Sequence, residues 1–598
     1  MQTLSELLNN LNVSDIKELL DYFPGASKVG RKELLLAPIL QSMAGAGLHA
    51  VWEQLDDCQR LAVGEAVHGG HDGHGVFHAA RFAAKYGQQP AFRRSRDGER
   101  RYGSHGVMTV LCLFLQWDGA HYVIPTDLQN RLATFVPKPA ANALASAAVL
   151  PEPAADEAMP MPMTVRSTAP DALHDVVALL RASDQGLIAV SDKTRLPGIA
   201  GVRVVEGKIA GGDFYDIAAP KNAWEQSIGP IKALAWPLLL QAGALAQLNG
   251  SKLGLTAAGM KALQLAPADV ARGIWRKWLT STLLDEFSRV DAIKGQKGKA
   301  RMSAVGPRRA IVAHFLQRCP VDSWVSVSDL SRFMQAEGCP LTICHDIGSL
   351  YISDPNYGSL GYGGEHTWNL LQLRYLLCVL FEVCATLGMI DVAYVSPHEA
   401  RRDYGDLWGT DDMTFLSRYD GLMYFRLNAL GAYCLGVRDN YTPVAAAPTC
   451  TLAVQANLHV RVSGGDLSAD ELLMLDNWAS RETDQLWRLD REKAIAAVER
   501  GHDAAQLAAF LQERDSQPLP VQVEGFLRNC SKQGKAMKVL ATSLLIECVD
   551  PQTADLIAAH KDTARLCMRA GARHLVVRLD QEDKFRKAAR LLGYGIPV

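Results

Sequence analysis

Apolar positions near the start of the chain follow a helical period on either side of a Pro-Gly turn. VSDIKELLDYF (13–23) places Ile16, Leu19 and Leu20 on one face, and KELLLAPILQSM (32–43) places apolar residues at similar spacing. The turn between the two segments contains Pro24 and Gly25, which favour a break between helices. The pattern predicts two short helices that pack through these faces, the second of them through Leu34, Leu35 and Ile39.

A longer pattern, in which a helix is followed by two short strands and a capped second helix, recurs along the chain. It occurs at 238–263, at 384–396 continued by 420–436, and more faintly at 485–498. The second strand of each copy should deliver an N-cap residue to the next helix, and these residues are Thr256, Asn428 and Asp490. A hairpin placed in this way is typical of the wing of a winged-helix domain.

The segment RRAIVAHFLQRCPVDSWVSVSDLSRFMQAEG (308–338) precedes the second copy and has the pattern of a helix, a turn and a second helix. The second helix is expected to begin with Ser328 or Asp329 as its cap. Together these patterns predict a multidomain α+β protein, mostly helical, with tandem winged-helix-like domains. The C-terminal strands and helices predict a small two-layer α/β domain.

Pro/Ala-rich stretches at 137–163 and 440–450 interrupt these patterns and indicate linkers, the first of them a semi-rigid exposed tether. The expected organisation, in chain order, is a helical domain (1–136), a linker (137–170), two winged-helix-like domains (171–306 and 307–440) and a C-terminal domain (450–598).

The most apolar window, 369–395, contains Arg374, Glu382 and Asp391, with Gly388 as a helix stop. A membrane-spanning helix needs roughly 20 uninterrupted apolar residues, so this window predicts a buried helix followed by a strand. The N-terminus is amphipathic and acidic and has no signal-peptide pattern. We therefore expect a cytoplasmic protein that makes no membrane contact.

Charge and cysteine usage limit the classes of function. The formal net charge is −2, so any nucleic-acid site must be a local basic patch. The 12 cysteines are scattered without a C-x-x-C pair, which argues against a disulfide framework or a zinc ribbon and fits a reducing compartment.

Basic residues are densest in VDAIKGQKGKARMSAVGPRRA (290–310), where glycines separate them and no acidic residue follows Asp291. A flexible basic segment directly before a helix-turn-helix could follow a phosphate backbone, whereas the alternative is a solvated linker. The candidate DNA-contacting residues are Lys294, Lys297, Lys299, Arg301, Arg308 and Arg309.

A second basic group, Lys28, Arg31 and Lys32, lies between the two N-terminal helices. The helix–turn–helix with basic residues at its turn resembles a SAP-type DNA-binding module, so the 1–136 domain has a SAP-like start. A helical hairpin with a solvated basic turn is the alternative.

Catalytic motifs are scarce. The string GASKVGRKE (25–33) lacks the Lys-Ser/Thr ending of a phosphate-binding loop and follows a helix, so we expect no ATPase activity and no cofactor. A D…E-x-K nuclease would use Asp192, Glu206 and Lys208 to hold a divalent metal at the end of a strand. The alternative for VRVVEGK (202–208) is a plain hairpin, because E-x-K strings are common.

Four histidines, His68, His71, His74 and His78, occur in HGGHDGHGVFH (68–78) at intervals that suit a metal-binding helix. Four glycines in the same stretch oppose a helix and make a rigid ligand set costly, so a polar loop leading into a helix at 77–90 is the simpler interpretation. We expect no metal site here.

The last quarter of the chain resembles the helicase-associated domain found in the N-terminal region of XPB-type DNA helicases. The resemblance is carried by LAVQANLHVRV (452–462), LWRLDREKAIAAVERG (486–501), the segments 507–530 and 535–559, and HLVVRLDQEDKFRKAARLLGYG (574–595). Bacterial proteins with this domain and winged-helix-like repeats, but no motor, look similar to the present chain.

The resemblance implies a nucleic-acid-processing role and carries over no catalytic residue. We therefore expect a non-catalytic DNA-binding accessory protein that acts with a separately encoded helicase or nuclease in DNA repair or in defence against foreign DNA, such as phage. The alternatives are a metal-dependent nuclease of the D…E-x-K type and a transcription regulator.

Overall fold

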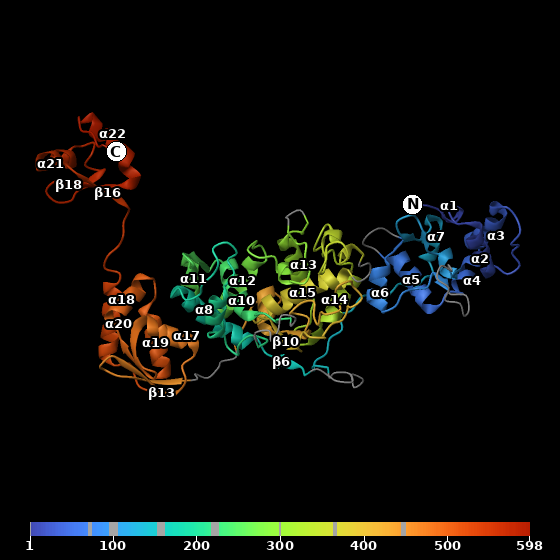
Figure 1. Cartoon of the computed structure of the whole chain (residues 1–598), viewed down its shortest axis with the longest axis horizontal. Helices are drawn as coiled ribbons and strands as arrows, with labels where there is room; N and C mark the ends of the chain where they lie inside the picture. The colour runs from blue at the N-terminus through green and yellow to red at the C-terminus, as the bar shows by residue number, and fades with distance from the viewer. Residues whose placement is uncertain are drawn as a thin grey trace. The chain divides into compact units, whose positions relative to one another are not determined.

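A computed structural model describes residues 2–69, 75–94, 106–151, 162–216, 226–297, 301–362, 367–443 and 450–597. The chain is α+β, with many helices and several small antiparallel sheets (Figure 1). It divides into two compact units, Met1–Ala446 with Ser468–Leu473 and Ala447–Leu467 with Met474–Val598. The division after Ala446 falls inside the Pro/Ala-rich stretch at 440–450.

The first unit begins with a helical region that has an apolar core of its own. Its helices are α1 (Leu4–Asn9), α2 (Val13–Leu19), α3 (Lys32–Ala44), α4 (Gly47–Trp52), α5 (Asp57–His68), α6 (Ala79–Tyr86) and α7 (Thr126–Leu132). Short strands, β1 (Val76–Phe77), β4 (Gln116–Trp117) and β5 (Tyr122–Val123), form a three-stranded sheet in the order β1-β5-β4.

The predicted face of α2 is confirmed, because Ile16, Leu19 and Leu20 are buried. The face of α3 is displaced by one residue from the prediction. Leu35 and Ile39 are fully buried, but Leu34 is 67% exposed. The buried set of α3 also includes Leu36 and Met43, which recur at intervals of three to four residues and leave Leu34 about 100° away around the helix.

The segment 137–163 is not a simple exposed tether over its described part. The backbone of Ala147 exchanges hydrogen bonds with Trp324 at 2.7 and 2.9 Å, and Asn142 donates to Glu337 at 2.6 Å. Residues 152–161 lie outside the described ranges. Pro/Ala-rich composition indicates an absence of regular structure, but it does not prevent short stretches from pairing with a neighbouring strand.

The first predicted helix–hairpin–helix pattern is present. A strand hairpin, β7 (Ala246–Asn249) with β8 (Lys252–Leu255), lies between α10 (Lys232–Ala242) and α11 (Ala257–Ala262). Thr256 caps α11, because its hydroxyl accepts from the backbone N–H of Gly259 at 3.0 Å. The other helices of this region are α8 (Ala169–Asp184), α9 (Ile199–Glu206) and α12 (Pro267–Trp278).

The second pattern is also present, and it extends into a four-stranded antiparallel sheet in the order β6-β10-β11-β9. Asn428 caps the helix after β11 as predicted, accepting from Gly431 N–H at 2.9 Å. The elements are β6 (Thr164–Arg166), α13 (Val305–Gln317), β9 (Trp324–Ser326), α14 (Val327–Ala336), β10 (Ile390–Tyr394), β11 (Leu422–Leu427) and α16 (Ala429–Leu435).

One capping prediction is wrong. Helix α14 is capped by Ser326, whose hydroxyl accepts from Asp329 N–H at 2.9 Å, and not by Ser328 or Asp329. The apolar Val327 is therefore the first helical residue, and it is buried. A cap two residues earlier lets β9 lead directly into α14.

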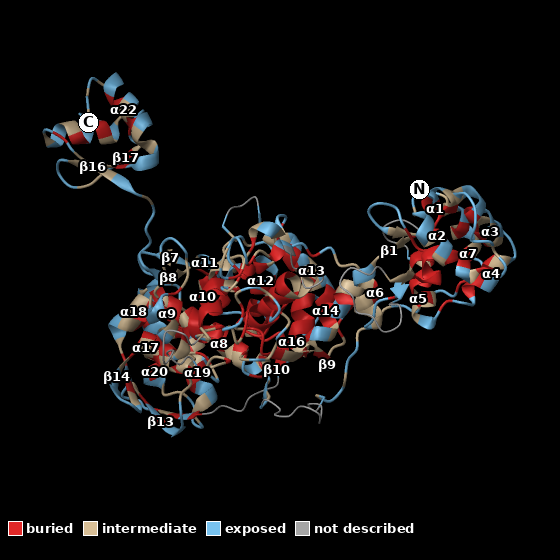
Figure 2. Ribbon diagram, turned by 45° about the vertical axis from the view of Figure 1, so that its right-hand side comes forward, coloured by how far each residue is buried: buried red, intermediate tan, exposed pale blue. Residues whose placement is uncertain are grey.

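The apolar window 369–395 is a buried helix followed by a strand, as predicted. The helix consists of η7 (Asn369–Leu373), α15 (Arg374–Cys378) and η8 (Val379–Cys384), of which η7 and η8 are π-helical, and β10 follows it. Its charges are buried and paired: Arg374 with Asp403 and Asp420, Glu382 with Arg289, and Asp391 with Arg426. Residues 373–395 are all buried, and Figure 2 shows buried residues concentrated around α10 and α12 of the same unit.

None of the helices in the described part of the chain has the length and apolar character that crossing a bilayer requires.

The second unit contains a four-stranded antiparallel sheet in the order β12-β13-β15-β14. The segment 452–462 contains parts of two strands, because residues 455–458 turn between β12 and β13. Asp490 caps α18 as expected, accepting from Glu492 and Lys493 N–H. The elements are β12 (Cys450–Val454), β13 (His459–Gly465), β14 (Ala479–Thr483), β15 (Leu486–Leu489), α18 (Arg491–Glu499), α19 (Ala504–Arg514) and α20 (Val521–Gln533). Helix α17 (Ala469–Trp478) precedes β14, and its residues up to Leu473 belong to the first unit.

The last 60 residues form a two-layer α/β fold with an apolar core of its own, as predicted. The helix that begins at Pro551 ends at Ala559, and a strand follows it at Cys567–Arg569. The elements are β16 (Ser543–Glu547), α21 (Pro551–Ala559), β17 (Cys567–Arg569), β18 (His574–Arg578) and α22 (Glu582–Leu591), with β18 central in the sheet.

Candidate nucleic-acid interface

The basic segment before α13 is described at its two ends, and both ends are held by backbone hydrogen bonds. Lys294 and Tyr351 exchange hydrogen bonds at 2.8 and 3.3 Å, and His345 N–H donates to Arg301 at 2.7 Å. Met302 and Cys344 form an antiparallel bridge. We call residues 294–302 the basic loop. It is thus presented from a fixed base formed by residues 344–351.

Gly295 is needed at the start of the basic loop. Its φ of +84° lies in the left-handed region, and a Cβ there would collide with the carbonyl oxygen of Ser349. The glycines in this sequence were expected to supply flexibility. At least this one instead allows the loop backbone to pass close to the segment that anchors it.

The side chains of Lys294, Lys297 and Arg301 are exposed, as a phosphate contact requires. Lys299 lies outside the described residues. The nearest acidic residue in the sequence, Asp291, is 2.6 Å from the guanidinium of Arg418 and is therefore partly neutralised. Three of the predicted cations are thus exposed in the described parts of the basic loop.

Arg308 and Arg309 do not belong to this surface, and their assignment as DNA-contacting residues is corrected. Both lie in α13 and are only 1% exposed. Arg308 forms a bidentate pair with Asp285 at 2.6 and 3.0 Å. Inside the basic sequence, the start of α13 at Val305 marks the change from exposed to buried cations.

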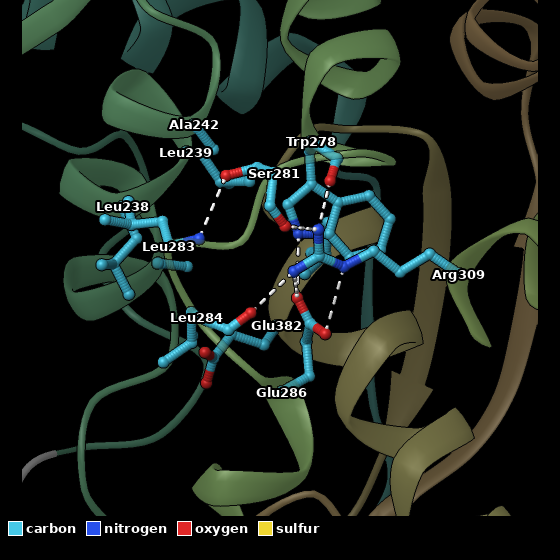
Figure 3. Close-up of a pocket in the computed structure, with 12 residues that line it drawn as sticks. Leu238, Leu239, Ala242, Trp278, Ser281, Leu283, Leu284, Glu286, Arg309 and Glu382 are labelled. Atoms are coloured by element: carbon cyan, nitrogen blue, oxygen red, sulfur yellow. Dashed lines mark hydrogen bonds and ion pairs between the residues drawn. The ribbon is translucent and has the colours of Figure 1, made fainter. Parts of the chain in front are cut away.

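Arg309 is enclosed by acceptors, as Figure 3 shows. It donates to both oxygens of Glu286, at 2.6 and 3.2 Å, and to the carbonyls of Trp278, Ser281 and Leu284. Trp278 also donates its indole N–H to Glu286 at 3.0 Å. Burial raises the pKa of the Glu286 carboxyl, whereas the positive charge of Arg309 opposes this shift.

The cavity beside Arg309 is a packing feature. Its volume is about 20 Å³, and its remaining walls are mostly apolar, including Leu238, Leu239 and Ala242. This is room for roughly one water molecule, too little for a ligand. The buried arginine therefore contributes to the fold and not to a binding site.

The SAP-like turn offers less free charge than its sequence suggests. Lys32 donates to the carbonyls of Asn9 and Leu11 at 2.6 and 2.7 Å, and Lys28 forms an ion pair with Asp21. Arg31, the residue before α3, is exposed. Lys32 therefore links α3 to the C-terminal end of α1, whereas Lys28 is paired locally with the turn that follows α2.

The histidine-rich stretch is only partly described. His71 and His74 lie outside the described residues. His68 ends α5, and its Nε2 is 2.9 Å from the carbonyl oxygen of Val136; His78 precedes α6. Among the described residues, no three His, Cys, Asp or Glu side chains gather closely enough to hold a metal ion.

The nuclease alternative loses its geometric basis. Glu206 is the last residue of helix α9 and Lys208 follows it, so VRVVEGK is neither the strand that a D…E-x-K site needs nor a hairpin. Asp192 is exposed in a turn. The run of valines suggested a strand, but a buried Val205 at helical spacing from Gly201 packs α9 against the core.

No protein-family model matches the chain, and no curated protein matches it.

Proposed function

We propose that this chain is a non-catalytic protein that binds DNA through the basic loop, contacting phosphates without reading base sequence. The observation that carries the proposal is the exposure of Lys294, Lys297 and Arg301 on a loop whose ends are fixed by backbone hydrogen bonds. A fixed base lowers the conformational entropy lost when the cations engage a phosphate backbone. The net charge of −2 means that attraction must come from such a local cluster.

We further propose that the two helix–hairpin–helix regions of the first unit are winged-helix-like. In the second region, α13, β9, α14, the 369–384 helix, β10 and β11 follow one another, and β9 pairs with β11. The 369–384 helix would be the groove-reading element of such a domain, yet residues 373–384 are all buried. Because that helix is not exposed to a major groove, we propose phosphate contact and not base readout.

The proposed partner is a separately encoded helicase or nuclease, in DNA repair or in defence against foreign DNA. This part rests on the resemblance of residues 452–595 to the helicase-associated domain of XPB-type helicases. It can be tested separately from DNA binding: the tagged chain, isolated from its own cells after crosslinking, should carry a motor or nuclease subunit identified by mass spectrometry. Isolation without such a subunit would remove the partner and leave the DNA proposal standing.

DNA binding is tested by fluorescence anisotropy with two duplexes of unrelated sequence at low salt. The variant Lys294→Ala/Lys297→Ala/Arg301→Ala should bind both duplexes at least about tenfold more weakly. The reason is that the DNA keeps the counterions that each lost phosphate contact would have released. A matched control is Lys561→Ala/Lys584→Ala/Lys587→Ala, which removes the same charge from exposed positions of the second unit. Equal weakening by both variants, or a preference of the wild type for one duplex, would contradict the proposal.

A further inference from the structure

A polar cavity lies next to the basic loop. Its volume is about 280 Å³, and its walls come from residues 226–227, 289–294 and 413–418. This is close to the lower end of the range for small-molecule sites, so the cavity has room for a small anion or one nucleotide but not for a duplex. Lys294 belongs both to this cavity and to the basic loop, so a nucleic-acid strand held on the loop can reach it.

The charges around the cavity are predominantly positive. Among the described residues, Arg289, Lys294 and Arg418 line it, together with one carboxylate, Asp291. The charge of Arg289 is already matched, because its Nε lies 3.2 Å from the buried carboxylate of Glu382. The ammonium of Lys294 donates to the backbone carbonyl of Asp291. Because a carbonyl has no net charge, this contact does not neutralise Lys294.

Arg418 is the cation whose partner can be replaced. Its side chain is only 11% exposed, but its partner Asp291, 2.6 Å away, is 65% exposed. A phosphate that enters the cavity can therefore replace the Asp291 carboxylate at Arg418. The displaced carboxylate turns toward the solvent and stays hydrated. A guanidinium binds phosphate oxygens through two parallel N–H donors, so the exchange retains its hydrogen bonds.

The wall that carries Arg418 is rigid. The buried Asp420 carboxylate accepts from Leu416 and Ser417 N–H at 2.9 and 3.0 Å. The side-chain oxygen of Gln226 accepts from Thr414 and Phe415 N–H. Gly229 lies against the guanidinium of Arg418, where a Cβ would collide with it. The cation is thus positioned before any ligand arrives, and it need not be ordered on binding.

We propose that this cavity binds a phosphomonoester, such as the terminal phosphate of a nucleic-acid strand held on the basic loop. A phosphomonoester carries between about −1.5 and −2 charges at pH 7, whereas an internal phosphodiester carries one. The two cations left once Asp291 moves away, Lys294 and Arg418, match the larger charge. That the phosphate belongs to the end of a nucleic-acid strand rests on the proposed DNA binding. That the cavity binds a phosphomonoester does not rest on it.

The test compares internally labelled single-stranded oligonucleotides that differ only at one end: 5′-phosphate, 3′-phosphate, or hydroxyl at both ends. One phosphorylated form should bind the whole chain roughly tenfold more tightly than the hydroxyl form, as expected for a new hydrogen-bonded charge pair. Arg418→Gln should abolish this difference and leave binding of the hydroxyl form within about twofold, since the basic loop is intact. Equal binding of all three forms by the wild-type chain would overturn the inference.

Asp291→Asn should change the preference for the phosphorylated strand in the opposite direction to Arg418→Gln. It removes the carboxylate that competes for Arg418, so preference for the phosphorylated strand should increase, which a loss of folding would not produce. An unchanged or smaller preference would count against the site. If no oligonucleotide binds at low salt, the terminal phosphate of a strand fails as the ligand, whereas the duplex measurement still decides the proposed function. Calorimetry with a deoxynucleoside monophosphate and with inorganic phosphate then tests the cavity alone. If neither ligand gives a binding heat that Arg418→Gln removes, the proposed phosphate site is overturned.

Discussion

Nη2 of Arg309 lies 2.6 Å from Oε1 of Glu286, and both side chains are only 1% exposed. Eight residues earlier, Arg301 belongs to the same basic stretch of sequence, yet its side chain faces solvent. The difference follows from local structure, because α13 begins between them at Val305. The helical part of this stretch of charge therefore holds the core together, whereas the described cations of its loop part stay exposed.

Arg309→Met should destabilise the first unit. Removing one partner of a buried ion pair leaves the other charge uncompensated and typically costs about 3–5 kcal/mol. The measurement is urea-induced unfolding followed by tryptophan fluorescence, in which Trp278, stacked 4.4 Å from the guanidinium, reports on the site. Arg301→Met is the control and should change the free energy of unfolding by no more than about 0.5 kcal/mol. A loss for Arg309→Met as small as the one expected for the control would show that this arginine is not structural.

A half-buried histidine on α8 makes stability depend on pH. His174 lies between two carboxylates of the first unit, with Nδ1 3.3 Å from Asp175 and Nε2 3.4 Å from Asp470. Hydrogen bonds to Asp175 and Asp470 raise the pKa of His174 to about 9. Although burial opposes the shift, His174 and Arg181 lower the pKa of Asp470 to about 2.

The sign of the effect follows from the raised pKa of His174. The charged imidazole stabilises the folded state fully below its ordinary pKa of about 6.5, and this contribution is lost as pH rises toward 9. The difference in unfolding free energy between wild type and His174→Gln should therefore be largest below pH 6 and shrink above pH 7. A His174 pKa near 6.5 by NMR titration, or a difference that does not change between pH 6 and 9, would contradict this.

Two neighbouring cations of the SAP-like turn should behave differently. Lys32→Met removes an ammonium that donates to the carbonyls of Asn9 and Leu11, and hydrogen bonds to charged groups are worth about 1.5–3 kcal/mol. Arg31→Ala changes an exposed side chain and should cost no more than about 0.5 kcal/mol. Thermal unfolding of the two variants by circular dichroism makes the comparison. A larger loss for Arg31→Ala would show that the contacts of Lys32 do not stabilise the N-terminal helices.

Much of the local structure follows from short sequence signals. The sequence predicts three helix caps, each at a polar residue between a strand and the next helix: Thr256, Asn428 and Asp490. Each of them accepts the capping hydrogen bonds. The 369–395 window was predicted as a buried helix because its charges ruled out a membrane span. These signals lie within a few residues of the structure that they specify, so no distant contact was needed to interpret them.

Other features depend on contacts distant in the sequence and could not be predicted from it. Nothing near Arg309 shows that Glu286 lies in the core to receive it, 23 residues earlier. The strand-like valines before Glu206 form a helix because tertiary packing outweighs their propensity. The cavity beside the basic loop joins residues almost 200 positions apart, such as Gln226 and Arg418, and no local pattern in either segment indicates it.

The salt dependence of DNA binding tests the central proposal most directly. Affinity for a duplex should fall linearly with the logarithm of salt concentration, with each phosphate contact contributing about 0.9 to the slope. Replacing Lys294, Lys297 and Arg301 by Ala should flatten the slope by roughly 2 to 3 while circular dichroism stays unchanged, because these exposed side chains contribute little to the core. A triple variant that binds as tightly as the wild type, with the same slope, would show that the basic loop does not contact DNA.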